Sequence, residues 1–360
     1  MSTSKPSPVV SHQSKDNHKS RALKKHLKRF WAWHLVAWIC ITVLVVCITI
    51  FVIVPVSAQD KVDDAHLEIQ GINALECRPD SLLIQINSTI TTDGAVKANL
   101  DAFEGNLTLS GVPNAAPFMS LRFPPTSADR FQAINISQVV TIRDKEAFAQ
   151  YNRLFFRSES LAIDVLGRTN ARPAGLAKKY PVEFRKTIEL KGLNMLRGTQ
   201  IKDTGISLRG GSALLNATAI ITNPSYYTIE MVSASNTPTL SATLGNQSLT
   251  RILKQGNVTF DIFANDHSTG TLDVNNLLLR PGINNIPITS RVNQTQVLQL
   301  VKSPQFCEKG IIPFQLRVHE VRANGEEIPW LESAMRGATQ SVDINIGEIL
   351  GRKDTNFCAP

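Results

Sequence analysis

The sequence predicts a mainly β protein, in which an N-terminal transmembrane helix precedes two tandem fibronectin- or immunoglobulin-like antiparallel β-sandwich domains with short packed helices. Three observations predict this class. Residues 35–54 form an uncharged apolar run, about as long as a bilayer core is thick. Many short segments beyond it alternate apolar and polar residues between Gly, Pro, Asn or Asp turns, which is typical of antiparallel sandwiches. Two further segments have helical periodicity.

The basic charge of the chain is concentrated before the apolar run. Residues 1–30 hold eight Lys or Arg and one Asp, and so carry +7 of the formal net charge of +8. Because Lys and Arg next to a span stay on the cytosolic side, we expect residues 1–30 to be a disordered cytosolic tail and residues 31–56 to be a signal-anchor helix. The rest of the chain is then luminal or extracellular, in a type II arrangement. Its near-neutral charge argues against nucleic acid as a partner.

A cleaved signal peptide is the alternative interpretation of the apolar run. Val56, Ser57 and Ala58 offer small residues suited to cleavage. Two features favour the uncleaved anchor: the run exceeds the roughly 7 to 15 residues of a signal core, and a long polar tail precedes it. A mature protein that started near Gln59 would contradict the anchor.

Basic residues lie directly before the span and form a cluster of Lys24, Lys25, Lys28 and Arg29. One interpretation is that this cluster only determines the topology. The other is that it also binds the membrane surface, since anionic cytosolic lipids attract basic residues by roughly 1 kcal/mol each. The lipid bilayer is therefore the first expected partner.

Period-two alternation predicts half-buried strands along the rest of the chain. The predicted strands begin at Ser81, Asn106, Ile134, Ser160, Val182, Ser212, Asn257, Pro313 and Gln340. Helical periodicity starts at Asp144, where Phe148, Tyr151 and Phe155 share a face, and again at Ile328, where Pro329 suits the first turn. We expect both helices to pack on a sheet.

A weak internal repeat predicts the domain boundaries. The segment QGIN at Gln70 and the strand after it resemble TGIS at Thr204 and its following strand. The repeat places one domain at residues 66–196 and a second at residues 198–348, followed by a C-terminal tail at residues 349–360. Each domain then has an ordinary size.

Acceptor sequences for N-glycosylation occur only beyond the span. The seven sequons lie at Asn87, Asn106, Asn135, Asn216, Asn246, Asn257 and Asn293. In most of them the Asn falls on the strand face opposite the apolar residues, which is the solvent-facing position that a bulky glycan requires. We expect most of these sites to carry sugar.

Five cysteines divide between the span and the rest of the chain. Cys40 and Cys47 lie in the span and are expected to be apolar packing residues. Of the three beyond it, we expect Cys307 and Cys358 to form a disulfide, because they bracket the C-terminal segment in a compartment that is oxidising. Cys77 would then be buried or free, and the spacing fits no zinc site.

Motifs for catalysis or cofactor binding are not found. His66, His267 and His319 have no metal-ligand spacing, and no nucleophile elbow or phosphate-binding loop occurs. Asp266, His267 and Ser268 have the residue types of a hydrolytic triad, but adjacent residues on one loop do not normally reach that geometry, so a polar turn is expected. We therefore predict no catalytic, cofactor-binding or metal site, and we expect that the protein is not an enzyme.

Three segments carry a family resemblance: ALLNATAIITNPSYYTIEM, NVTFDIFANDHSTGTL and NNLLLRPGINNIPI. They resemble the late-embryogenesis-abundant group-two domain, also called the water-stress-hypersensitive-response domain. The basic tail, single span and tandem domains, together with TIRDKEAFAQYNRLFFRSESLAIDVLGRTNA and VEFRKTIELKGLN, are similar to fungal vacuolar-membrane proteins. The resemblance covers roughly residues 60–350.

The resemblance implies fibronectin-like sandwiches, no catalytic residues, no cofactor, a vacuolar membrane linked to autophagy control, and a lipid-binding groove between sheet and helix. The first domain departs from the second, with TDG at Thr92 where the second has TNPS, and with an insertion that includes FPPTS. A groove carried over from the family therefore fits the second domain better.

Two functions of different class are expected from the sequence. The first is a non-enzymatic luminal module that binds lipid or another hydrophobic ligand. The alternative is a membrane signalling or scaffold adaptor whose tail engages a cytosolic protein. A luminal hydrolase is a third class, for which no site can be assembled. The same topology suits the endoplasmic reticulum or the plasma membrane, and the vacuole rests on the resemblance alone.

Overall fold

The structure of the chain is a computed structural model that describes residues 16–94, 97–127, 129–209, 212–231, 256–323, 325–337, 339–352 and 356–358. The chain divides into two compact units, residues 1–58 and residues 59–360. The described residues are mainly in strands, which form antiparallel sheets after one N-terminal apolar helix. The predicted fold class is confirmed.

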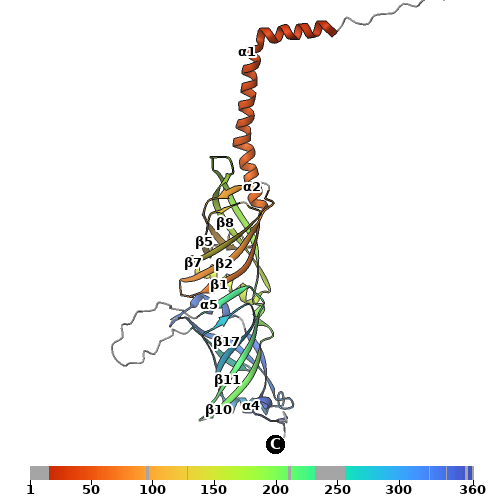
Figure 1. Cartoon of the computed structure of the whole chain (residues 1–360). Helices are drawn as coiled ribbons and strands as arrows, with labels where there is room; N and C mark the ends of the chain where they lie inside the picture. Colours follow the sequence, from red (N-terminus) through yellow and green to blue (C-terminus); the bar gives the residue numbers. More distant parts are fainter. Residues whose placement is uncertain are drawn as a thin grey trace, which may run out of the picture. The chain divides into compact units, whose positions relative to one another are not determined.

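The first unit is helical. Helix α1 (Asp16–Ile48) continues through a wider turn η1 (Thr49–Ile53) into helix α2 (Val54–Asp64), as Figure 1 shows. In the described part of the chain, the helical stretch Trp31–Asp64 is the one that is long and apolar enough to cross a membrane. An α-helix satisfies its own backbone hydrogen bonds, so it can lie in lipid without a protein partner.

Helix α1 starts well before the predicted span. Residues 16–30 are helical, so the predicted disorder of this part of the tail is wrong. Ala, Leu, Lys and Arg are strong helix formers, and a helix that already exists extends into such residues without a new nucleation step. Residues 1–15, for which disorder is also predicted, lie outside the described residues.

Helix α2 continues past the predicted end of the span at residue 56, and its last turns, from Gln59 onward, belong to the second unit and pack within it. Val62 is buried. The side chain of Gln59 donates to the backbone carbonyl of Glu183 and accepts from its N–H, at 2.9 Å each. Lys186 donates to the backbone carbonyl of Asp63 at 2.7 Å.

The first sandwich of the second unit has two sheets. One sheet has the order β15-β12-β1-β2-β7, with β15 (Leu278–Leu279), β12 (Tyr227–Glu230), β1 (His66–Leu75), β2 (Ser81–Thr91) and β7 (Phe131–Thr141). The other has the order β5-β4-β8-β3-β6, with β5 (Met119–Phe123), β4 (Phe103–Leu109), β8 (Ser160–Pro173), β3 (Ala98–Leu100) and β6 (Thr126–Ser127), while β9 (Tyr180–Lys191) pairs with β8.

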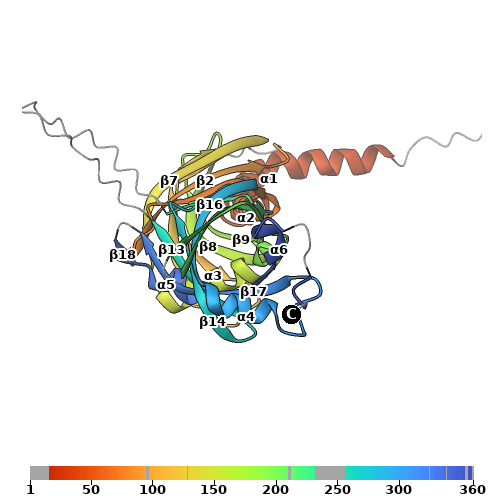
Figure 2. The same ribbon diagram turned by 90° about the horizontal axis from the view of Figure 1, so that it is seen from below.

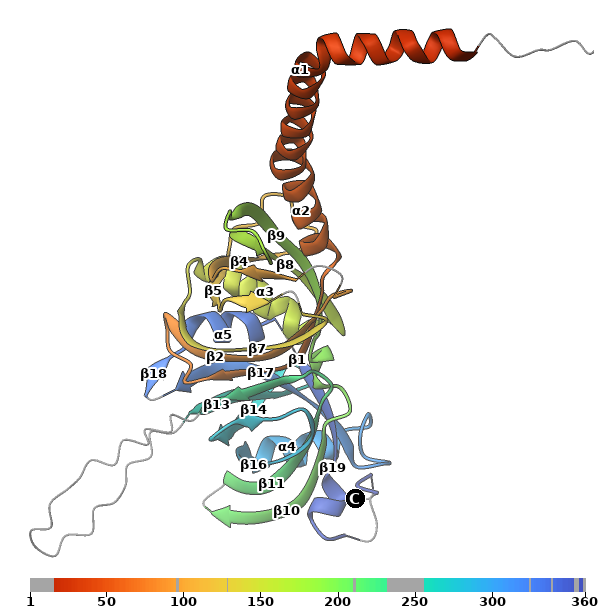
Figure 3. The ribbon, with the colours of Figure 1, turned by 45° about the horizontal axis from the view of Figure 1, so that its top comes forward.

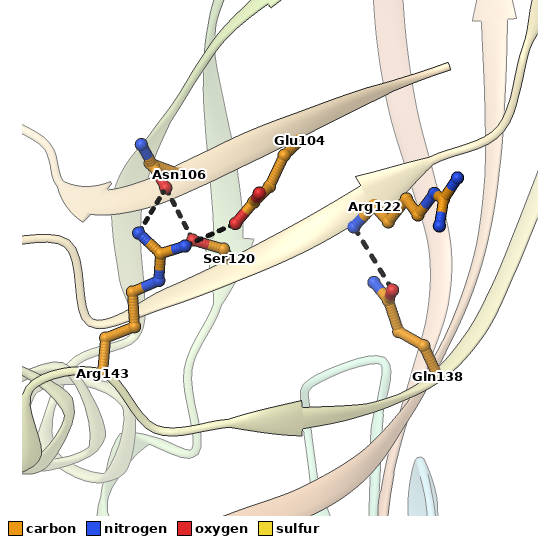
Figure 4. Close-up of polar contacts among 6 residues, drawn as sticks. All are labelled: Glu104, Asn106, Ser120, Arg122, Gln138 and Arg143. Atoms are coloured by element: carbon orange, nitrogen blue, oxygen red, sulfur yellow. Dashed lines mark hydrogen bonds and ion pairs between the residues drawn. The ribbon is translucent and has the colours of Figure 1, made fainter.

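Glutamine side chains close one side of this sandwich. Gln138 of β7 accepts from the backbone N–H of Arg122 in β5 at 3.3 Å, which is drawn in Figure 4. Gln132 of the same strand accepts from the backbone N–H of Ser127 at 2.7 Å. These amides satisfy backbone donors that a neighbouring strand would otherwise satisfy.

The remaining strands form one eight-stranded antiparallel sheet. Its order is β10 (Gln200–Arg209), β11 (Ser212–Asn223), β16 (Gly282–Asn293), β14 (His267–Asn275), β13 (Asn257–Ala264), β17 (Ile311–Ala323) and β18 (Glu326–Glu327), and β19 (Gln340–Asn345) also pairs with β17. Helices α4 (Gln294–Val301) and α6 (Ile346–Ile349) follow strands of this sheet, and Figure 2 shows both from its lower end.

Both predicted amphipathic helices are confirmed. Helix α3 (Lys145–Arg157) begins after Asp144, whose side chain accepts from the backbone N–H groups of Glu146 and Ala147 at 3.0 Å each. Helix α5 (Pro329–Met335) has Pro329 in its first turn. Figure 3 shows α3 and α5 side by side, and the rings of Phe148 and Trp330 are 4.8 Å apart.

The predicted domain boundary at residues 196–198 does not separate the sheets. Strand β12 lies in the second half of the chain but pairs in parallel with β1, with Ile72 opposite Tyr227. The turn that places β12 there is formed by the Asn-Pro sequence at Asn223. Asn223 ends β11, accepts from the backbone N–H of Ser225 at 2.9 Å, and donates to the carbonyl of Tyr227 at 2.8 Å. A local polar turn thus brings a distant strand to the first sandwich.

Candidate functional site

An apolar cavity of about 120 Å³ lies on the inner face of the eight-stranded sheet. Period-two alternation directs apolar side chains of nearly every strand toward it. The strands contribute Ile201, Ile206, Ala213, Leu215, Ile262, Leu272, Ile288, Ser290, Val292, Phe314, Leu316, Val342 and Ile344, and α4, α6 and their flanks contribute Gln294, Val297, Leu298, Ile346, Ile349 and Leu350.

The cavity lies where the sheet fails to close on itself. Among the described strands, β10 pairs with β11 alone and β19 pairs with β17 alone. Ile206 of β10 and Ile344 of β19 both line the cavity and are half-buried. Leu350, just after α6, also lines it and is 42% exposed. The cavity therefore reaches the surface along the seam lined by β10, β19 and the residues after α6, and Figure 3 shows the two strands at the same end of the sheet.

Two smaller cavities lie next to the first and share lining residues along the row. A cavity of about 90 Å³ shares Ile201, Leu316 and Val342 with it. A third, of about 40 Å³, shares Phe156 and Leu331 with the second. The three together form a row of apolar cavities that runs from α4 and α6 toward the packed helices α3 and α5.

Ser290 is the polar residue buried in the wall of the first cavity. It is 2% exposed, and its Oγ has no hydrogen-bond partner among the described residues. Polar residues of the neighbouring cavities are satisfied instead. Thr199 donates to the carbonyl of Leu196 at 2.7 Å, and in the cavity of the first sandwich Ser88 donates to the carbonyl of Ile134 at 3.0 Å.

An aromatic cluster ends the row of cavities. Its members Phe148, Tyr151, Phe155, Tyr227 and Trp330 are all buried. The hydroxyl oxygens of Tyr151 and Tyr227 are 2.7 Å apart, and the indole N–H of Trp330 donates to the carbonyl of Arg78 at 3.0 Å. Burial raises the pKa of Tyr151 to about 12 and raises the pKa of Tyr227 well above its ordinary value. Both phenols are therefore neutral donors and acceptors at physiological pH.

Four of the predicted glycan acceptors lie at the surface. Asn87 and Asn135 are exposed and directly opposite each other on β2 and β7. Asn216 is exposed on β11 and accepts from Thr289 at 3.2 Å. Asn293 is exposed and caps α4, accepting from the backbone N–H of Gln296.

The other predicted acceptors differ. Asn106 is half-buried, and its carbonyl oxygen accepts from Ser120 and Arg143 while its amide nitrogen points away from them (Figure 4). Asn257 is half-buried, and its Oδ1 is buried with no partner among the described residues. Asn246 lies outside the described residues.

The three cysteines beyond the span fall into two groups, one disulfide-bonded pair and one buried free thiol. Cys307 and Cys358 are joined in a disulfide. Cys77 is free and 1% exposed, and burial raises the pKa of its thiol to about 12. Cys40 and Cys47 are free and exposed on α1. The basic cluster that is predicted to meet the membrane surface, Lys24, Lys25, Lys28 and Arg29, lies in α1.

The described residues contain no group of three or more His, Cys, Asp or Glu that could hold a metal ion. Asp266 and His267 lie at the turn between β13 and β14, where Asp266 has a φ of 60° and pairs with Arg317. His319 contacts Asp261 at 3.1 Å on the exposed face. The turn is thus polar, as expected, and its Asp266 forms an exposed ion pair with Arg317.

The sequence predicts a groove only through the family resemblance, and it neither locates this cavity nor singles out Ser290. One signal was available: in the strand GINNIPITSRVN, Ile286, Ile288 and Ser290 share the inward face. A hydroxyl at an inward position of an apolar row has to find a partner or remain unsatisfied. The cavity itself depends on two edge strands about 140 residues apart, which local periodicity does not detect.

Comparison with known proteins adds one family match. Residues 116–237 match a family described as "Protein of unknown function (DUF3712)". The matched residues include β5 to β12, and so contain both Tyr151 and Tyr227 but only the first part of the cavity wall. No curated protein matches the chain.

Among solved structures, the chain is similar to "The structure of a beta-glucuronidase from glycoside hydrolase family 2". The two chains are 11% identical, and the alignment has a TM-score of 0.21. It covers 75% of this chain and 24% of the other, so this chain spans about a quarter of that protein's length.

Proposed function

We propose that this protein is a non-enzymatic, single-pass membrane protein whose β-rich unit binds lipid or another hydrophobic ligand in the cavity of the eight-stranded sheet. The observation that carries the proposal is the cavity itself, about 120 Å³ in volume, with apolar walls and a half-exposed rim along the seam. An engineered apolar cavity of about 150 Å³ stays dry and binds benzene. A cavity of similar size here suits a segment of an alkyl chain.

Burial of an alkyl segment provides the driving force. Each buried methylene contributes about 0.8 kcal/mol, so four methylenes would contribute about 3 kcal/mol before the costs of binding. The second cavity extends the apolar path past Ile201 and Val342. A longer chain could therefore follow the row of cavities and gain more from burial.

The cellular setting is part of the proposal. The basic residues before the span support a cytosolic N-terminus, and the sequons beyond it support a glycosylated luminal unit. The resemblance to fungal vacuolar-membrane proteins favours the vacuole and a link to autophagy control. A membrane-anchored luminal unit would meet its ligand at or near the bilayer that holds it.

A cavity-filling substitution tests the ligand site. Ala213 lines the cavity, whereas the next residue, Leu214, is 37% exposed and faces away from it. Ala213→Phe should therefore block the cavity, and Leu214→Phe is a matched control on the same strand. The full chain would be purified in nanodiscs and released for native mass spectrometry, and its acceleration of lipid transfer between vesicles would be measured.

We expect a co-purifying lipid and accelerated transfer with the wild type and Leu214→Phe, and a loss of both with Ala213→Phe. No bound lipid and no transfer with the wild type would contradict the proposal. Equal binding by the wild type and Ala213→Phe would place the ligand elsewhere. Thermal unfolding of each variant shows whether it is folded.

A further inference from the structure

Ser290 gives the cavity a polar point whose chemistry restricts the ligand. In the described part of the chain, four buried side-chain atoms lack a hydrogen-bond partner, and one of them, the Oγ of Ser290, belongs to a residue that lines this cavity. A buried hydroxyl without a partner costs about 1–3 kcal/mol. A ligand that supplies the partner recovers that cost, so the hydroxyl favours a ligand with a polar group at this position.

The strand pairing holds Ser290 at a defined place. It lies opposite Leu215 of β11 and Leu272 of β14, both of which also line the cavity. Pairing on both sides restrains the backbone, and the inward direction of the side chain follows from the strand period. The hydroxyl is thus held on the wall, where it can donate one hydrogen bond and accept others.

The rest of the wall excludes charge. No Asp, Glu, Lys, Arg or His lines the cavity, and Gln294 is the other polar residue among its described lining residues. An ionised carboxylate or ammonium buried there would lack a counter-ion, which is far more costly than an unpaired neutral group. A hydroxyl or carbonyl group carries no such cost and pairs well with serine.

We infer that the cavity selects a neutral lipid with one hydroxyl or carbonyl group, which hydrogen-bonds to Ser290 while the hydrocarbon part follows the row of cavities past Ile201 and Val342. This inference rests on the proposed function and specifies its ligand. A long-chain alcohol has the required chemistry, whereas the fatty acid of the same length presents a charge at neutral pH.

The test uses three diazirine-bearing probes of equal chain length: an alkane, a primary alcohol and a carboxylate. The full chain in phosphatidylcholine nanodiscs would be irradiated with each probe over a range of concentrations, and mass spectrometry would locate the labelled residues. Ser290→Ala removes the hydroxyl and keeps the cavity. Ser341→Ala is the matched control, because Ser341 is exposed on β19, another strand of the same sheet.

In the wild type we expect labelling of cavity residues by the alcohol at about tenfold lower concentration than by the carboxylate. Ser290→Ala should raise the half-labelling concentration of the alcohol about fivefold, the loss of one neutral hydrogen bond. It should leave the alkane unchanged, and Ser341→Ala should change neither. Melting temperatures establish that both variants are folded.

The two proposals fail in different ways. If the alkane does not label cavity residues at all, the proposed function is wrong. If the alkane labels the cavity but Ser290→Ala affects alcohol and alkane equally, or the carboxylate labels as well as the alcohol, the inference about a neutral polar group is wrong and the apolar site remains.

Discussion

The phenol groups of Tyr151 in α3 and Tyr227 in β12 share one buried hydrogen bond, with 2.7 Å between their oxygens. The two residues are 76 positions apart and belong to different halves of the chain. Tyr227 also stands opposite Ile72 in the parallel pairing of β12 with β1. The bond therefore fastens the helix α3 to a strand that the second half of the chain contributes to the first sandwich.

Removal of one phenol should destabilise residues 59–360. Tyr227→Phe leaves the Tyr151 hydroxyl buried without this partner, at a cost of about 1–3 kcal/mol in the free energy of unfolding. The double variant Tyr151→Phe with Tyr227→Phe replaces both partners by apolar groups, so its loss should be clearly smaller than the sum of the single losses. Urea unfolding of the full chain in detergent, followed by circular dichroism, measures each value. Additive losses would contradict the coupling.

Alkaline pH should destabilise the same region. Burial raises the pKa of Tyr151 from 10.0 to about 12, and burial raises the pKa of Cys77 from 9.0 to about 12. In the folded protein both groups keep their protons, while in the unfolded chain they ionise at lower pH. The unfolded state then binds fewer protons, so stability is complete below pH 9 and falls as the pH rises toward about 12.

The measurement is the melting temperature of the full chain between pH 8 and pH 12. A decline that starts above pH 9 is expected, and the double variant Tyr151→Phe with Tyr227→Phe should decline less steeply because two of the buried acidic groups are gone. Identical slopes for the wild type and the double variant would show that other groups cause the alkaline loss.

Cys77 should react with alkylating reagents only after unfolding. The thiolate is the nucleophile, and this thiol is buried, with its Sγ 4.0 Å from the carbonyl of Glu230. Incubation of the folded chain with iodoacetamide at pH 8 should leave Cys77 unmodified, whereas addition of urea should expose it.

Peptide mapping under non-reducing conditions should recover Cys307 joined to Cys358, and a peptide that joins Cys77 to either would contradict this arrangement.

Loss of the disulfide should release the C-terminal segment. Cys307 and Cys358 are 51 positions apart, and Phe357 beside the bridge is buried and donates its N–H to the carbonyl of Cys307 at 2.7 Å. For a loop of this length, chain entropy predicts a loss of about 4 kcal/mol in Cys358→Ser. Urea unfolding of Cys358→Ser, with Cys307→Ser as the matched variant that breaks the same bridge from its other end, measures it. Equal stability of the wild type and Cys358→Ser would contradict a structural role.

Residue patterns predicted the helices and strands whose formation depends on residues close to them in the sequence. The alternation in β2 and the 3.6-residue period of α3 follow from which face each element buries, and Asp144 caps α3 as a short acidic side chain can. The four residues of β12 gave no such signal, since its partner β1 lies about 150 positions earlier. The seam between β10 and β19 and the isolated hydroxyl of Ser290 likewise depend on tertiary arrangement, which residue patterns do not contain.

Glycan occupancy should follow the exposure of the acceptor amide. Asn87 and Asn135 are exposed on adjacent strands, while the Oδ1 of Asn257 is buried and Thr259 of the same sequon bonds to Asp273 at 2.9 Å. Because the Asn257 side chain is half-buried with its oxygen inside the fold, a bulky glycan on it would crowd the neighbouring strands, so chains that fold should carry none there. Replacement by Gln should remove one glycan at Asn87 or Asn135 and none at Asn257.

Gel mobility before and after glycosidase treatment measures each loss in the full chain expressed in a eukaryotic host. The Asn257→Gln variant is the internal control, because it should migrate with the wild type. If glycosidase leaves the wild type unchanged, the sequons are unused and the proposed luminal side is wrong. If Asn257→Gln loses a glycan while Asn87→Gln does not, exposure in the folded sheet does not govern which sites are occupied.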